Sequence, residues 1–156
     1  SGGALVNDRG QLVGICTLYS SDTESFAGIG FAIPVDIAQP IIKDLEEKGS
    51  VVRPFFGVEI YSLDEVPRSE WRDTLRLPEE VEGGVYIWST EPLSPADKAG
   101  LKRLDVITEF NGEKVLNTLD LRKILYQELK IGDEVSIVYY RDGEKRETKV
   151  KLIEQP

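Results

Sequence analysis

The sequence predicts an α+β fold built from short strands and short helices. Apolar runs of strand length recur along the chain and are bounded by turn residues such as Asn-Gly and Asp-Gly. Two segments instead place apolar residues at helical spacing. The 156 residues are 40% hydrophobic and 30% charged, which is typical of a globular protein, and the length allows one domain or one domain with an additional segment.

The first 48 residues are expected to form strands followed by one helix. The Asn-Asp-Arg-Gly turn at 7–10 separates two apolar runs, which indicates a hairpin. Asp36 is predicted to cap the helix and Gly49 to end it. A linker at 49–54 marks the predicted boundary of this domain. The expected elements are strands at 4–6, 12–16 and 29–33, a polar loop at 18–28 and a helix at 36–48.

Residues 53–156 are expected to form a second, mixed domain. Ser94 followed by Pro95 is a typical start of a short helix, and Thr118 is expected to open a longer one. Asp-Gly at 142–143 favours a tight hairpin between the last two strands. The expected strands are 55–61, 84–89, 105–110, 134–140 and 145–153, and the expected helices begin at Ser69, Ser94 and Thr118, the last ending near Leu129.

Histidine and methionine are absent from the sequence, and Cys16 is its one cysteine. Without histidine, neither a Ser-His-Asp nor a Cys-His catalytic set can be completed within this chain. The lack of histidine also excludes a histidine-bearing zinc site, and a single cysteine excludes an intrachain disulfide. We expect no metal and no cofactor. Because the sequence does not begin with Met, we interpret it as a piece of a longer protein.

The net charge of the chain argues against one class of partner, and its hydropathy offers no segment that could cross a membrane. The chain has 19 basic and 28 acidic residues and therefore a net charge of −9. This charge argues against nucleic acid, because a phosphate backbone requires a basic face. No apolar run is long enough to cross a bilayer, and no signal segment is visible.

Residues 1–48 carry three motifs in order, namely Ser-Gly-Gly-Ala-Leu-Val-Asn at 1–7, Gly-Gln-Leu-Val-Gly-Ile at 10–15 and Gly-Ile-Gly-Phe-Ala-Ile-Pro at 28–34. At these separations they resemble the end of the trypsin-like protease domain in HtrA-family (DegP-like) serine proteases. The first Ser of Ser-Gly-Gly is the nucleophile in that family, so the resemblance places this role on Ser1. The glycines let the backbone turn sharply and point N–H groups at a developing oxyanion.

The same resemblance indicates what surrounds Ser1 and what this chain lacks. It places Cys16, Thr17 and Leu18 beside bound substrate, and it makes residues 18–28 the loop that walls the primary specificity pocket. The family's general base His and orienting Asp precede the nucleophile and are not in this chain, so we expect the chain itself to be inactive. Two other interpretations of Ser1 stay open: a remnant of a tag, or an N-terminal nucleophile that uses its own amine as base.

Residues 53–156 resemble a PDZ domain of the HtrA arrangement. The motifs are Arg-Pro-Phe-Phe-Gly-Val-Glu-Ile at 53–60, Gly-Val-Tyr-Ile at 84–87, Ser-Pro-Ala-Asp-Lys-Ala-Gly-Leu at 94–101 and Leu-Arg-Lys-Ile-Leu at 121–125. The resemblance implies a small, partly open β-barrel or sandwich with two helices. Leu104 departs from the family, which usually has Gly before Asp105, and this leaves the conformation of the local turn open.

A domain of this kind binds an extended peptide as an added strand between a strand edge and a helix. The resemblance places the loop that holds a terminal carboxylate at 55–58, where Gly allows the turn and successive N–H groups supply partial positive charge. One ring of the Phe-Phe pair is expected to face the pocket and the other the core, and plain packing is the alternative role for each apolar residue. The predicted peptide-binding residues are Phe55, Phe56, Gly57, Val58, Ile60, Leu121, Ile124 and Leu125.

The two resemblances together predict the C-terminal part of an HtrA-like serine endoprotease for protein quality control. They imply an extracytoplasmic parent, at the cell surface, anchored to a membrane or in a periplasm. Its PDZ domain is expected to bind hydrophobic C-termini of peptides or unfolded proteins and to regulate proteolysis.

The strands of residues 1–34 are expected to lack partners within this chain, so we expect this segment to be disordered or paired with a second copy. The parent is expected to be a homo-oligomer. The alternative to a protease is a non-catalytic PDZ adapter whose protease-like segment is only a scaffold.

Overall fold

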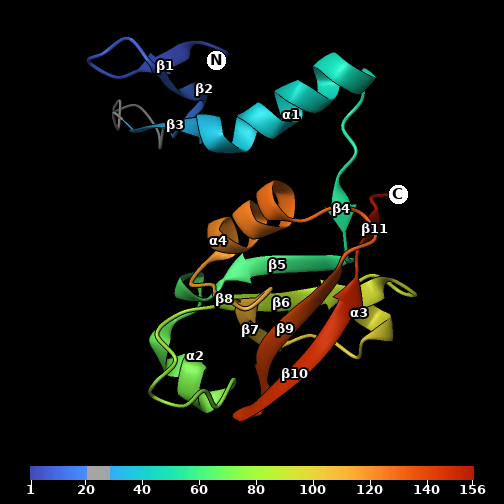
Figure 1. Ribbon diagram of the computed structural model, residues 1–156. Coiled ribbons are helices and arrows are strands. Elements are labelled where there is room, and N and C mark those ends of the chain that lie inside the picture. Colours follow the sequence, from blue (N-terminus) through green and yellow to red (C-terminus); the bar gives the residue numbers. More distant parts are fainter. Residues whose placement is uncertain (21–28) are drawn as a thin grey trace. The chain divides into compact units, whose positions relative to one another are not determined.

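The computed structural model describes residues 1–20 and 29–156 and divides into two compact units, Ser1–Val51 and Val52–Pro156 (Figure 1). The first unit is a three-stranded antiparallel sheet with one helix. The second is a larger antiparallel sheet with several short helices. Most of the predicted loop at 18–28, namely 21–28, lies outside the described residues.

The first unit is organised around a hairpin. Its strands, in sheet order, are β1 (Ala4–Val6), β2 (Leu12–Ser20) and β3 (Ile29–Pro34). Asn7 closes the turn between β1 and β2, because its Oδ1 accepts hydrogen bonds from the N–H groups of Arg9 at 3.0 Å and Gln11 at 2.9 Å. A short polar side chain of this kind satisfies backbone groups that a tight turn leaves unpaired.

Strand pairing in this unit corrects two expectations. β2 continues to Ser20, so residues 18–20 are strand and not loop, because the backbone at 19–20 pairs with that at 29–30. Residues 18–20 are Leu-Tyr-Ser, two of which suit a strand, so the polar composition that predicted a loop belongs to the residues that follow them. The three strands also supply one another with partners, so disorder does not apply to the described part of 1–34, and pairing with a second copy stays a prediction.

The helix α1 (Val35–Lys48) begins earlier than predicted. Pro34 occupies the N-cap with φ −57° and ψ 141°, and Asp36 lies in the first turn instead of capping it. A carboxylate in the first turn still interacts favourably with the helix dipole. Gly49 ends the helix as predicted, with φ 72° and its N–H bonded to the carbonyl oxygen of Leu45 at 3.0 Å.

The second unit is built on a six-stranded antiparallel sheet. Its main path runs β10 (Glu144–Lys151), β9 (Glu134–Arg141), β7 (Val106–Phe110), β6 (Val85–Thr90) and β5 (Val58–Ser62), with β8 (Glu113–Lys114) paired to β7. β4 (Pro54–Phe55) pairs with β11 (Ile153–Glu154). The predicted strand 55–61 is therefore two strands, because its two halves have different partners.

The helical segments of this unit are short. They are η1 (Leu63–Glu65), α2 (Arg68–Asp73), α3 (Pro95–Lys98) and α4 (Thr118–Lys123), which a π-helical turn at Ile124–Glu128 continues. Ser94 caps α3 as predicted, since its Oγ accepts the N–H of Asp97 at 3.2 Å. Pro67, and not Ser69, precedes α2. No helix in the described ranges is long and apolar enough to span a membrane.

Apolar side chains pack on both faces of the main sheet. Val106 and Ile107 are adjacent on β7 and belong to different buried clusters, so these clusters lie on opposite faces. The larger cluster joins the sheet to α4 through Leu121 and to the π-helical turn through Leu125. The smaller cluster anchors the segment between β5 and β6, where the indole Nε1 of Trp71 donates to the carbonyl oxygen of Leu63 at 3.1 Å.

Leu104 adopts a conformation that suits glycine. Its φ is +75°, in the left-handed region that a Cβ disfavours, and its N–H is fixed to the carbonyl oxygen of Ile87 at 2.9 Å. The side chain is 42% exposed. We expect Leu104→Gly to be more stable than Leu104→Ala, which keeps the Cβ, by about 1 kcal/mol. Urea denaturation of both variants measures this difference, and equal stabilities would show that the turn is unstrained.

Candidate functional site

The edge strand β5 and the helix α4 flank a groove of about 110 Å³, and Figure 1 shows α4 lying along β5. The two elements run in opposite directions. Ser62 ends β5, and its Oγ accepts the N–H of Thr118, at the start of α4, at 3.0 Å. Tyr126 in the π-helical turn lies at the other end, beside Phe55. The lining residues are Pro54, Phe55, Phe56, Gly57, Val58, Ile60, Leu121, Arg122, Leu125 and Tyr126.

The loop between β4 and β5 presents backbone donors at one end of this groove. The carbonyl oxygens of Phe56 and Gly57 accept hydrogen bonds from the N–H groups of Ala96 at 2.8 Å and Glu91 at 2.9 Å, which fixes the loop. Within residues 1–20 and 29–156, the N–H groups of Phe56 and Gly57 have no acceptor. Successive N–H groups in such a turn form a concave site that suits an anion.

Gly57 is needed for the shape of the loop. Its φ is +87°, which disfavours any residue with a Cβ. A Cβ at this position would lie 2.2 Å from the Cβ and 2.5 Å from the Oγ of Ser94. The helix cap of α3 therefore lies against the loop and leaves room only for hydrogen.

The structure brings most of the predicted peptide-binding residues together. Phe55 is half-buried at the groove, whereas Phe56 is 2% exposed and its ring lies 5.5 Å from that of Phe110 in the core. Leu121 and Leu125 are buried residues that line the groove. Ile124 is buried in the core and does not line the groove.

Sequence reasoning missed three lining residues. Pro54 precedes the predicted loop, and Arg122 and Tyr126 lie on the helix. Helix spacing was the available signal, because residues four apart share a face. Leu121 to Leu125 and Arg122 to Tyr126 are both pairs of this kind.

These elements correspond to a known domain. The sequence profile of the PDZ domain matches residues 54–152, which contain the whole groove. The chain belongs to the PDZ family. The PDZ-like α+β fold expected from the sequence is confirmed. Its helices include α3 and α4, and α2 lies in the segment between β5 and β6.

The whole chain, and not the PDZ domain alone, is similar to HtrA-type serine proteases. It is 39% identical over 156 residues to "Serine protease Do-like HtrB" of Bacillus subtilis (strain 168) and 40% identical over 153 residues to "Serine protease Do-like HtrA" of the same strain. These alignments cover 99% and 97% of this chain and 34% of each relative. The chain therefore spans about a third of the length of these relatives.

A solved structure of an HtrA-type protease is also similar to the whole chain. The structure described as "HtrA-type protease AlgW with decapeptide" is 31% identical with a TM-score of 0.72, over 100% of this chain and 46% of that one. The predicted resemblance to the HtrA family is confirmed, and it includes the unit that precedes the PDZ domain.

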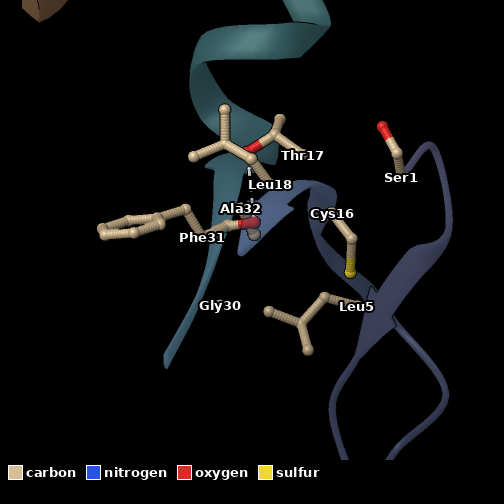
Figure 2. A pocket seen from close by; sticks show the side chains of 8 residues that line it. All are labelled: Ser1, Leu5, Cys16, Thr17, Leu18, Gly30, Phe31 and Ala32. Carbon is tan, nitrogen blue, oxygen red and sulfur yellow. Dashed lines mark hydrogen bonds between the residues drawn. The ribbon is translucent and has the colours of Figure 1, made fainter. Parts of the chain in front are cut away.

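That first unit contains a pocket of about 220 Å³ (Figure 2). Ser1 and the predicted substrate-proximal residues Cys16, Thr17 and Leu18 all line it. The hydroxyl of Thr17 donates to the carbonyl oxygen of Phe31 at 3.1 Å, and Cys16 is a free, half-buried thiol. No carboxylate or basic side chain is among the lining residues, so the described part of this unit offers Ser1 no side-chain general base at the pocket.

Proposed function

We propose that the PDZ domain binds the free C-terminal end of an extended polypeptide as an additional strand on β5. The observation that carries this proposal is the loop at Phe56-Gly57, whose two N–H groups are free at the end of an apolar groove. β5 lies at the edge of its sheet, so its outer backbone groups are available to a new strand. The apolar lining favours hydrophobic side chains at the peptide's end.

We expect a hydrophobic peptide with a free C-terminal carboxylate to bind at least about tenfold more tightly than the same peptide with a C-terminal amide. The reason is that hydrogen bonds to a charged acceptor contribute about 1.5–3 kcal/mol each. Fluorescence anisotropy with a labelled peptide measures both dissociation constants. Equal affinities of the acid and the amide would contradict carboxylate recognition.

We further propose that the parent protein is an HtrA-like serine endopeptidase of extracytoplasmic protein quality control, in which Ser1 is the nucleophile and peptide binding regulates cleavage. The similarity to proteins named as serine proteases supports this proposal. Unpaired strand edges and exposed apolar residues in the first unit, such as Leu18 and Phe31, support self-association of the chain and a homo-oligomeric parent.

The parent protein tests the protease proposal. In the parent, we expect replacement of the residue numbered Ser1 here by Ala to lower casein cleavage at least about 1000-fold. We expect the 156-residue chain alone to cleave nothing measurable. A parent sequence without a His and an Asp upstream would support the adapter function in place of the protease.

A further inference from the structure

Three aromatic side chains, those of Tyr61, Tyr86 and Trp88, line a pocket of about 280 Å³. Tyr61 alternates with Ile60 along β5, and Ile60 lines the peptide groove, so the aromatic pocket opens on the opposite face of the main sheet. Val66 also lines the pocket, and it packs with Tyr86 against the smaller buried cluster. The residues that line the pocket and those that line the groove are different, so the two sites are separate.

The three rings meet at steep angles and form a corner. The rings of Tyr61 and Tyr86 stand at 89° and 70° to that of Trp88, with ring centroids 6.5 and 6.3 Å apart. Tyr61 and Trp88 are 42% and 41% exposed, so a ligand in solution can reach this corner. The faces of aromatic rings are electron-rich and attract cations. A corner suits a compact ammonium group better than the flat guanidinium of an arginine.

The charge beside these rings is negative. Glu65 is the charged residue among those described as lining the pocket. Its Oε2 accepts the N–H of Ser62 at 2.8 Å, which holds the carboxylate in place, and a carboxylate can accept about four hydrogen bonds. Glu59 lies beside Tyr61 and accepts its hydroxyl at 3.0 Å. This hydrogen bond raises the pKa of Tyr61, and the charges of Glu59 and Glu65 raise it further, as a negative potential does.

Trp88 already holds one cation of this chain. The guanidinium carbon of Arg103 lies 3.9 Å from the centroid of the indole ring. Arg103 is not among the described residues that line the pocket, so its contact with the ring leaves the pocket open.

We propose that these three rings and Glu65 form a second binding site, which takes the ammonium group of a lysine side chain of a partner protein. The rings attract the charge, and Glu65 accepts a hydrogen bond from the N–H groups that a primary ammonium carries. Sites for drug-sized ligands have about 300–1,000 Å³, so a pocket of about 280 Å³ suits a single side chain. Occupancy of the peptide groove is not required for this site.

NMR titration of the ¹⁵N-labelled 156-residue chain tests the proposal, because the chain has two tryptophans and each gives an indole N–H signal. The probes are peptides acetyl-Gly-Ser-Xaa-Ser-Gly-amide, in which Xaa is lysine, acetyllysine or trimethyllysine. Their blocked ends offer no terminal carboxylate to the groove. The buried indole of Trp71 is the internal reference.

We expect the lysine peptide to shift the signal of Trp88 in a saturable way and to leave that of Trp71 nearly unchanged. Its dissociation constant should be at least about threefold lower than that of the acetyllysine peptide, which has lost the charge. The trimethyllysine peptide should bind more weakly than the lysine peptide, because it has no N–H to donate to Glu65. Added salt should reduce the preference for lysine.

Matched variants assign the effect to the pocket. Glu65→Gln should weaken binding of the lysine peptide about two- to fivefold. Asp64→Asn removes the same charge from the preceding residue, which is not among those described as lining the pocket, and should leave binding unchanged. Tyr61→Leu should weaken binding by a similar factor, whereas Tyr61→Phe, which keeps the ring, should not. Arg103→Gln should strengthen binding, because it removes a like charge from beside Trp88.

Equal binding of the lysine and acetyllysine peptides would overturn the proposal, and so would equal losses in Glu65→Gln and Asp64→Asn. Trimethyllysine binding as tightly as lysine would also overturn it, since the ligand would then be a quaternary ammonium compound. If Trp88→Leu lowers self-association of the chain in sedimentation velocity, the pocket belongs to a second copy and not to a partner protein. These results would leave the proposed peptide binding standing, because the comparison of acid and amide peptides tests that function separately.

Discussion

Replacing Asp105 with Ala is expected to lower the free energy of unfolding of the PDZ domain by about 3–5 kcal/mol. Asp105 is fully buried, and its two carboxylate oxygens accept hydrogen bonds at 2.8 Å from Nε and a terminal nitrogen of Arg141. It also accepts the N–H of Lys102 at 2.7 Å. Its loss leaves the backbone N–H of Lys102 and the Nε of Arg141 without their acceptor. The Arg141 side chain is only 22% exposed, and its terminal nitrogen keeps only the carbonyl oxygen of Gly100, at 2.7 Å.

Urea denaturation followed by tryptophan fluorescence measures this effect. The matched control is Arg146→Ala, because the Arg146–Glu144 pair at 3.1 Å is largely exposed and should change stability by less than about 1 kcal/mol. In a double-mutant cycle, Asp105→Ala and Arg141→Ala should together cost less than the sum of the single changes. A loss below about 1 kcal/mol in Asp105→Ala would refute a structural role for the pair.

Arg141 itself adds no pH dependence near neutrality. The hydrogen bond from its side chain to Asp105 raises the pKa of Arg141 above its ordinary value, against the opposing effect of burial. A group whose pKa is raised by folding contributes its full stability below the unfolded pKa and loses it only as the pH rises through the folded value. That window lies far above neutral pH, because an arginine already titrates only in strong base before its pKa is raised.

Replacing Gly57 with Ala is expected to destabilise the PDZ domain by about 2–4 kcal/mol and to weaken peptide binding at least about tenfold. One part of the cost is the left-handed conformation at φ +87°, about 1–2 kcal/mol. Another is the contact with Ser94, which forces the loop to move and costs about 1–3 kcal/mol. The movement displaces the N–H groups that we propose bind the carboxylate.

Two variants separate these contributions. Gly100→Ala introduces a Cβ at a similar φ of +83° with nothing within 4 Å, so it reports the conformational part alone. Ser94→Gly removes the clashing side chain, at a cost of only a few tenths of a kcal/mol at a helix N-cap. In the Gly57→Ala background, Ser94→Gly should restore the part of the stability lost to the contact, and part of the affinity, while the conformational cost at φ +87° stays. Equal costs of Gly57→Ala and Gly100→Ala would contradict the steric argument.

Features that depend on a few adjacent residues were predictable from the sequence. The Ser94-Pro95 start of α3, the Gly49 end of α1 and the Asp-Gly hairpin at 142–143 are all present, the last with φ 50° and 82°. In each case a side chain or a glycine acts on backbone groups within a few residues, so the local sequence contains the cause.

Features that depend on distant residues were not predictable from the sequence. The split of 55–61 follows from the pairing of Phe55 with Ile153, about a hundred residues away. Helix spacing groups Arg122 with Tyr126, but it does not say which face of the helix meets the groove. Ile124 was therefore expected in the groove, while Arg122 and Tyr126 were missed.

From the sequence alone, the order of the glycine motifs predicted a chain related to HtrA proteases, which the relatives confirm. The absence of histidine showed that this chain carries no catalytic His of its own. Only the tertiary structure decided that β5 is an edge, that Ser94 leaves Gly57 no room for a side chain, and that Arg122 lines the groove. Each of these depends on which surfaces meet when segments far apart in the sequence pack together, and such contacts leave no periodic or local mark in the sequence.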